Sequence, residues 1–217
     1  MLIDMNIFRS VLLRVEMSSN DIFKFVFKME SMLNFHPITS VADPLFMNLF
    51  NLYVLAFPPT ERKSWAGLEY ELNYEKRFHV YAFMQNDKFV GFLNTWLFDR
   101  FYYIEHFAVS PNFRDQHIGS EALQMLMSQI KLPIVLEVEM PNSPAAIRRI
   151  QFYERLGFSV LSHKYAQPPY EDNGFLLPMQ LMSNNLHFAS THFEFIKENL
   201  YTNVYHYETE TERKEEL

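Results

Sequence analysis

Hydrophobic and polar residues follow two kinds of pattern along the chain after residue 32, and together they predict both strands and helices. Alternating or short apolar runs between turn signals predict strands at residues 33–39, 78–85, 89–98, 101–109, 134–140, 158–161 and 175–182. Apolar residues at three- and four-residue spacing predict helices at residues 44–57, 118–130, 144–156 and 190–207. Without a repeat or a low-complexity linker, this order predicts one mixed α/β (α+β) domain.

The predicted helix at 44–57 lies in the longest charge-free stretch of the chain, Pro44 to Thr60. The stretch holds two Asn and three Pro, which make it a poor membrane span and favour a helix packed on the core. We expect Asp43 as its N-cap, with Pro44 at the first helical position. A short segment near Leu68 follows, before the next strand.

The two ends of the chain differ from this regular pattern. Residues 1–31 are apolar with scattered charges and predict an N-terminal extension of one or two short helices, although a translation start at Met32 is an equal alternative. They lack the clean apolar run and the cleavage site of a secretory signal. Residues 208–217 (ETETERKEEL) predict a solvated tail. The domain is therefore expected to span residues 32–207.

Composition narrows the function classes. Hydrophobic residues make up 48% and aromatic residues 17% of the 217, which is typical of a globular protein with a large core. The chain has no Cys, so disulfides, a thiolate nucleophile and a Cys-based zinc site are excluded, and we expect a cytoplasmic protein. The net charge of −7 without a basic stripe argues against nucleic acid, and no membrane segment is expected.

A strand, a short loop and a helix start follow one another in the segment IEHFAVSPNFRDQHIGS, residues 104–120. Free N–H groups and the helix dipole at such a start favour an anion such as a phosphate. Arg114 adds positive charge, and Gly119 allows the backbone to approach a ligand closely. By itself this segment is equally consistent with an ordinary loop into a core helix.

A second segment, RIQFYERLGF at residues 149–158, favours the anion site over the ordinary loop. Together the two segments resemble the GNAT superfamily of acyl-CoA-dependent N-acetyltransferases. The pyrophosphate loop of that family matches Arg114-x-x-His117-x-Gly119 behind Phe107-Ala108-Val109. Its later signature, Tyr-Glu-x-Leu-Gly-Phe, matches residues 153–158. The resemblance implies a three-layer domain, in which helices flank a mixed, mostly antiparallel sheet.

The resemblance also implies a cofactor site for acetyl-CoA, the acyl donor. Its residues are Phe107, Ala108, Val109, Arg114, Asp115, Gln116, His117, Ile118, Gly119 and Ser120. Backbone N–H groups near residues 107–109 are expected to polarise the acetyl carbonyl. The implied reaction is direct attack of a primary amine on the thioester.

Catalytic roles follow from the same resemblance. Tyr153 is the candidate acid, because a phenol suits a departing thiolate; its ring can also simply pack in the core. Glu137 and Glu105 are the candidate bases, in that order, and Glu137 resembles the Glu of a Leu-Glu-Val motif in ribosomal-protein N-terminal acetyltransferases. Glu137 and Glu139 alternate with apolar residues and are expected on one sheet face, where ion pairing is the alternative. His106 is expected on the face opposite Glu105, in a structural role.

Two departures from the family pattern support a rival hypothesis. His117 replaces the first Gly of the loop, and Ala146 stands where many members have Asn, with no role assigned to Asn142. The rival is a non-catalytic acyl-CoA-binding or protein-interaction module.

The acceptor is the least defined part of the prediction. In this family the acceptor pocket would be built by residues 61–65, Trp96 and residues 165–170. A small molecule, an amino acid and a protein N-terminus stay open as the amine, and so does a homodimer. The dispersed His residues indicate no metal site.

Overall fold

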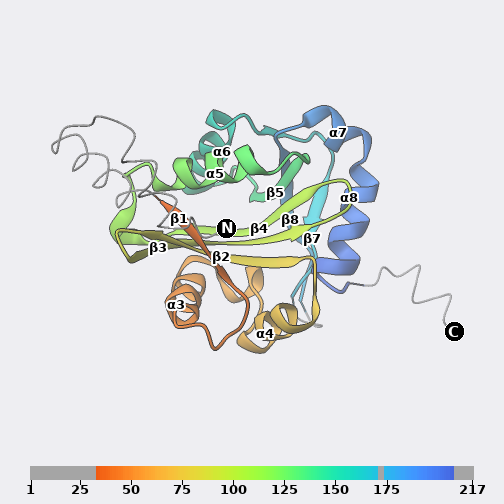
Figure 1. The fold of residues 1–217 in the computed structure, drawn as a ribbon. Coiled ribbons are helices and arrows are strands. Elements are labelled where there is room, and N and C mark those ends of the chain that lie inside the picture. Colours follow the sequence, from red (N-terminus) through yellow and green to blue (C-terminus); the bar gives the residue numbers. More distant parts are fainter. Residues whose placement is uncertain (1–32, 171–173, 208–217) are drawn as a thin grey trace, which may run out of the picture.

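The computed structural model describes residues 33–170 and 174–207 (Figure 1). The predicted N-terminal extension, the choice between Met1 and Met32 as the start, and the predicted tail at 208–217 fall outside the described residues.

An eight-stranded sheet forms the middle layer, in the order β1-β2-β3-β4-β5-β8-β6, with β7 also paired to β8. Among the strand pairs of the described residues, β4 and β5 alone run parallel. The strands are β1 (Asn34–Ile38), β2 (Phe78–Gln85), β3 (Lys88–Leu97), β4 (Tyr102–Val109), β5 (Ile134–Glu139), β6 (Ser159–Val160), β7 (Tyr165–Gln167) and β8 (Leu177–Ser183). The predicted mixed, mostly antiparallel sheet is confirmed.

Helices cover both faces of the sheet, so the predicted three-layer arrangement is also confirmed (Figure 1). One core cluster joins the sheet to α3, α4 and α8, and a second joins it to α5 and α6. The helical segments are α3 (Phe46–Ala56), η1 (Pro59–Glu61), α4 (Trp65–Tyr74), η2 (Pro111–Phe113), α5 (Ile118–Gln129), α6 (Pro144–Arg155), α7 (Leu186–Thr191), α8 (Phe193–Asn199) and the π-helix η3 (Leu200–Val204). None of the helices within the described ranges has the length and apolar character to cross a bilayer.

Two predicted helix boundaries are wrong for local reasons. The single helix predicted at 190–207 is α7, α8 and η3, because His192 leaves helical geometry (φ −112°, ψ 26°) and ends one helix as it begins the next. Helix α3 is capped at Leu45, and Asp43 is not its N-cap. Instead the Asp43 carboxylate accepts the Leu45 N–H at 2.8 Å in a turn before the helix, a local bond that competes with helix geometry.

A β-bulge in β4 sets the faces of two site residues. Asn94 of β3 lies opposite His106 and Thr95 lies opposite Ile104, so Glu105 is the extra residue. Because a bulge interrupts alternation, Glu105 and His106 both face the side of α3 and α4. The prediction that His106 lies on the face opposite Glu105 is therefore wrong.

The bulge coincides with the end of the parallel pairing between β4 and β5. That pairing runs from Tyr102–Ile134 to Ile104–Leu136, although both strands continue further. A bulged strand bends and twists, so β4 diverges from β5 beyond Ile104. The separation leaves an opening in the middle of the sheet.

Gly91 of β3 lies where this bent region is tightly packed. A Cβ at Gly91 would meet the Ala108 carbonyl oxygen at 2.5 Å and the Phe83 ring at 2.9 Å. We expect Gly91→Ala to lower the free energy of unfolding by about 1–3 kcal/mol, measured by urea denaturation. Gly119→Ala is the matched control, because its Cβ would have no neighbour nearer than 3.4 Å. Equal stability of the two variants would contradict this account.

Candidate active site

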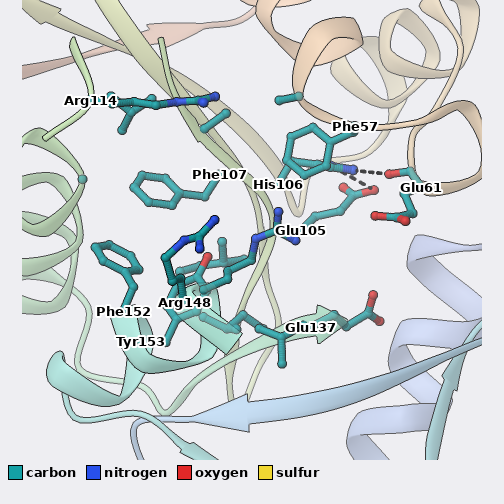
Figure 2. A pocket seen from close by; sticks show the side chains of 18 of the residues that line it. Phe57, Glu61, Glu105, His106, Phe107, Arg114, Glu137, Arg148, Phe152 and Tyr153 are labelled. Carbon is teal, nitrogen blue, oxygen red and sulfur yellow. Dashed lines mark hydrogen bonds and ion pairs between the residues drawn. The ribbon is translucent and has the colours of Figure 1, made fainter. Parts of the chain in front are cut away.

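The opening between β4 and β5 contains a cavity of about 750 Å³. Its walls come from both strands, the loop before α5, helix α6 and the end of α3. Figure 2 shows the two ends of this cavity: Arg114 and Arg148 lie toward one end, and the carboxylates of Glu61, Glu105 and Glu137 lie toward the other. The site therefore has a basic end and an acidic end.

The basic end is formed at the start of α5. His117 is the N-cap and supplies no side-chain hydrogen bond to the helix. The first N–H groups of the helix, at Ile118, Gly119 and Ser120, therefore have no capping group and lie at the cavity wall beside Arg114. The arrangement suits an anionic group with several oxygens.

The backbone of the loop explains the glycine that the motif contains at position 117. His117 has φ 61° and Asp115 has φ 60°, both in the left-handed region. Non-glycine residues reach this region at a cost of about 1–2 kcal/mol. His117 thus keeps the conformation that a glycine would adopt, and its side chain adds to the cavity wall.

Nine of the ten predicted cofactor-site residues line the cavity, and Gln116 does not. The Gln116 amide Nε2 instead donates to the Asn112 carbonyl oxygen at 3.2 Å, which holds the side chain against its own loop. Residues 107–109 pair with β3 along one edge only, since β5 has diverged. Alternate backbone groups of this segment consequently face the cavity.

Glu105 is a fully buried carboxylate held by three partners at the acidic end. Trp96 Nε1 donates to it at 2.7 Å and the Tyr170 hydroxyl at 3.0 Å, while Lys63 Nζ lies 3.8 Å away. A buried charge is tolerated when it is paired and hydrogen-bonded in this way. Its partners fix the position of the Glu105 carboxylate in the cavity wall.

Glu137 lies on the same side of the sheet and accepts hydrogen bonds from the hydroxyls of Tyr165 and Tyr205, the latter at 2.7 Å. Burial raises the pKa of Glu137 to about 7, helped by the charge of Glu105 and opposed by the tyrosine hydrogen bonds. A carboxyl group with this pKa exchanges a proton near neutral pH. Glu139 forms an ion pair with Arg149 and is not part of this cavity.

Tyr153 lies on α6 and lines the cavity, and only 6% of its surface is exposed. Its ring packs against Phe152 and Phe158, with centroids 5.2 and 5.8 Å apart. Burial raises the Tyr153 pKa to about 12, and the charge of Arg149 lowers it by a smaller amount. The phenol therefore keeps its proton until a strong base forms beside it.

Other predicted pocket residues have different positions. Trp65 is half-buried outside the cavity and packs edge-on against Phe46 and Phe50, each with a centroid distance of 4.8 Å. Glu61, Gln167 and Tyr170 do line the cavity. Sequence reasoning missed Phe57, Arg148 and Tyr205, and no local pattern marks them. Across residues 33–170 and 174–207, no group of three or more His, Asp or Glu could hold a metal ion.

Both the sequence and the fold of the chain are similar to those of known proteins. The model of the acetyltransferase (GNAT) family matches residues 46–158. A putative GNAT acetyltransferase from Bacteroides thetaiotaomicron is 38% identical with a TM-score of 0.76, covering 81% of this chain and 99% of that one.

Two more distant structures share the fold. An acetyltransferase from Thermus thermophilus is 14% identical with a TM-score of 0.52, covering 70% of this chain and 96% of that one. An aminoglycoside 6′-N-acetyltransferase complexed with coenzyme A is 16% identical with a TM-score of 0.50, covering 70% and 95%. The sequence matches no curated protein significantly.

The raised pKa of Glu137 predicts a pH-dependent loss of stability. A carboxyl group with a pKa of about 7 when folded and 4.5 ordinarily binds its proton more tightly in the folded chain. Its contribution to stability therefore falls as pH rises from about 4.5 through about 7. We therefore expect the difference in unfolding free energy, wild type minus Glu137→Gln, to decrease as pH rises over that range. Urea denaturation at each pH measures both values. The exposed Glu154→Gln variant is the control, and parallel curves for wild type and Glu137→Gln would refute the shift.

Proposed function

The chain belongs to the acetyltransferase (GNAT) family, and from that premise we propose that it transfers the acetyl group of acetyl-CoA directly to a primary amine. The sequence prediction of the family is confirmed. The observation that carries the proposal is the cavity itself. An anion-binding helix start lies at one end, and a proton-accepting carboxylate lies at the other.

Coenzyme A suits the basic end of the cavity. Its pyrophosphate would accept hydrogen bonds from the free N–H groups at the start of α5, with Arg114 as a counter-charge. A Cβ at Gly119 would lie 3.4–3.5 Å from Phe152, Phe107 and Val109, which is room enough within the protein. Glycine at this position therefore serves the ligand that lies against the helix start.

The transfer replaces a C–S bond with a C–N bond, and each proton that moves has a defined donor and acceptor. Glu137 takes a proton from the bound ammonium, and the neutral amine then attacks the thioester carbonyl. The C–N bond forms while the carbonyl oxygen gains negative charge, which backbone N–H groups of residues 107–109 stabilise. The C–S bond then breaks, and Tyr153 donates its proton to the departing thiolate. The amide nitrogen loses its second proton to solvent, and solvent reprotonates Tyr153. Glu137 releases the proton that it took to solvent, which completes the cycle.

Glu105 has a positioning role in this scheme. Its charge, fixed by Trp96, Tyr170 and Lys63, raises the proton affinity of Glu137 across the cavity. With no Cys in the chain, a cysteinyl intermediate is excluded. The acceptor is a small-molecule or peptide amine.

Calorimetric titration with acetyl-CoA, followed by free-thiol detection with pooled amines, tests the proposal. Binding together with amine-dependent thiol release is the expected result. Binding without thiol release across a broad amine panel would instead favour a non-catalytic acyl-CoA-binding module, and the absence of binding would contradict both.

Tyr153→Phe tests the acid. The variant keeps the packing of the ring but cannot protonate the thiolate, so we expect kcat to fall about 100-fold while the Kd for acetyl-CoA stays unchanged. Steady-state kinetics and calorimetry measure the two. Tyr81→Phe, on β2 and outside the cavity, is the matched control. Full turnover of Tyr153→Phe across the pH range would remove Tyr153 from the chemistry.

Gly119→Ala tests the site of the pyrophosphate. The added methyl group fits the protein but occupies space among residues that line the cavity. We expect unchanged or higher thermal stability, because Ala favours helix, together with acetyl-CoA binding that is weaker by about tenfold or more. Wild-type affinity in calorimetry would move the pyrophosphate away from this helix start.

A further inference from the structure

The acidic end of the cavity carries more negative charge than one ammonium group balances. Lys63 lies 3.1 Å from Glu71 and 3.8 Å from Glu105, and Arg149 pairs with Glu139. The hydrogen-bond donors of Glu137 are neutral tyrosine hydroxyls, so the ammonium group of the reacting amine would be its counter-charge.

Glu61 has no such partner. It lies on η1, half-buried, between the main cavity and a smaller adjoining cavity of about 320 Å³. Within the described part of the chain, its carboxylate makes no hydrogen bond or ion pair. Burial raises the pKa of Glu61, as does the nearby charge of Glu139, and Arg149 lowers it. Figure 2 shows its carboxylate on the same side of the cavity as those of Glu105 and Glu137.

His106 supplies an independent observation. Its Nε2 lies 2.8 Å from the Glu61 carbonyl oxygen, which can only accept, so Nε2 carries a hydrogen. Burial lowers the pKa of His106, so the ring is neutral and Nδ1 is a bare acceptor. His106 is 3% exposed and lines the cavity, and Nδ1 has no hydrogen-bond partner among the described residues. Glu105 Oε1, 3.8 Å from Nδ1, is itself an acceptor. A buried acceptor without a donor costs free energy, and an N–H group of a bound ligand would satisfy it.

We propose, building on the acetyl transfer proposed above, that the acceptor substrate is a diamine. Its reacting amine lies at Glu137, its second ammonium group lies at Glu61, and Nδ1 of His106 accepts an N–H of the same molecule. An acceptor with a carboxylate at its far end is disfavoured, because that group would meet Glu61 and Glu105. The opposite, basic end of the cavity is reserved for the anionic donor.

Three acceptors of equal chain length separate charge from size in the wild-type enzyme. Butane-1,4-diamine, butylamine and 4-aminobutanoate present a cation, a methyl group and a carboxylate at the far end. Propane and pentane diamines with their matching monoamines extend the series. With thiol release as the readout, we expect kcat/KM for the best diamine to exceed that of its monoamine about tenfold. We expect the amino acid to be the poorest acceptor.

Variants at Glu61 locate the effect. In Glu61→Gln the ratio of kcat/KM for diamine over monoamine should fall to about one, and Glu61→Lys should favour 4-aminobutanoate over the diamine. The matched control is Glu154→Gln, which removes an exposed carboxylate of α6 outside the cavity and should keep the wild-type ratio. Because each variant is judged by a ratio, a general loss of activity does not imitate the result.

The outcomes separate this inference from the function on which it rests. Equal use of diamine and monoamine by the wild type would overturn the diamine assignment and leave acetyl transfer intact, as would a ratio that survives in Glu61→Gln. Binding of acetyl-CoA with no acetylation of any amine would overturn the transfer itself.

Discussion

Parallel pairing between β4 and β5 stops after Ile104 and Leu136, at the residue where β4 also bulges against β3. The bulge gives the divergence its cause, because the extra residue at Glu105 bends the strand away from its parallel neighbour. The cavity, the unpaired backbone edge of residues 107–109 and the shared face of Glu105 and His106 all depend on this local geometry. Tight packing around Gly91, directly opposite the far end of β4, holds the bent strand against β3.

An opening in a sheet exposes buried carboxylates that need hydrogen-bond donors. Tyrosine hydroxyls supply these donors: the rings of Tyr165, Tyr170 and Tyr205 pack in or against the core, and their hydroxyls donate to Glu137 and Glu105. Neutral donors satisfy Glu137 without supplying a full countercharge, so burial dominates and raises its pKa to about 7. Glu105 also has the cation Lys63 nearby. Two acids on neighbouring strands thus have different electrostatic surroundings because of their partners.

The sequence contains a clear local signal for the basic end and a weak one for the acidic end. Residues 114–119 and 153–158 lie in continuous segments whose backbone shape is set locally. The local pattern therefore predicted the helix start, and the resemblance of both segments to the GNAT family pointed to Tyr153. The face of His106 depends on a register shift between β3 and β4, which alternation within one strand cannot reveal. Tyr205 follows a C-terminal helix that breaks at His192 and continues as a π-helix, and its hydroxyl bonds Glu137, 68 residues away in sequence. Such contacts between distant segments leave no trace in short-range patterns.

The family motif has glycine at positions 117 and 119 for two different physical reasons. Position 117 needs a left-handed backbone, which His117 adopts at a modest cost in conformational energy, so glycine there is a preference and not a requirement. Position 119 has ordinary helical geometry and room for a Cβ within the protein, so no constraint from folding explains its glycine. A residue other than glycine therefore stands at position 117, where the only cost is the conformational energy of the chain itself. Glycine remains at position 119, where a side chain would occupy the space that we propose for the pyrophosphate.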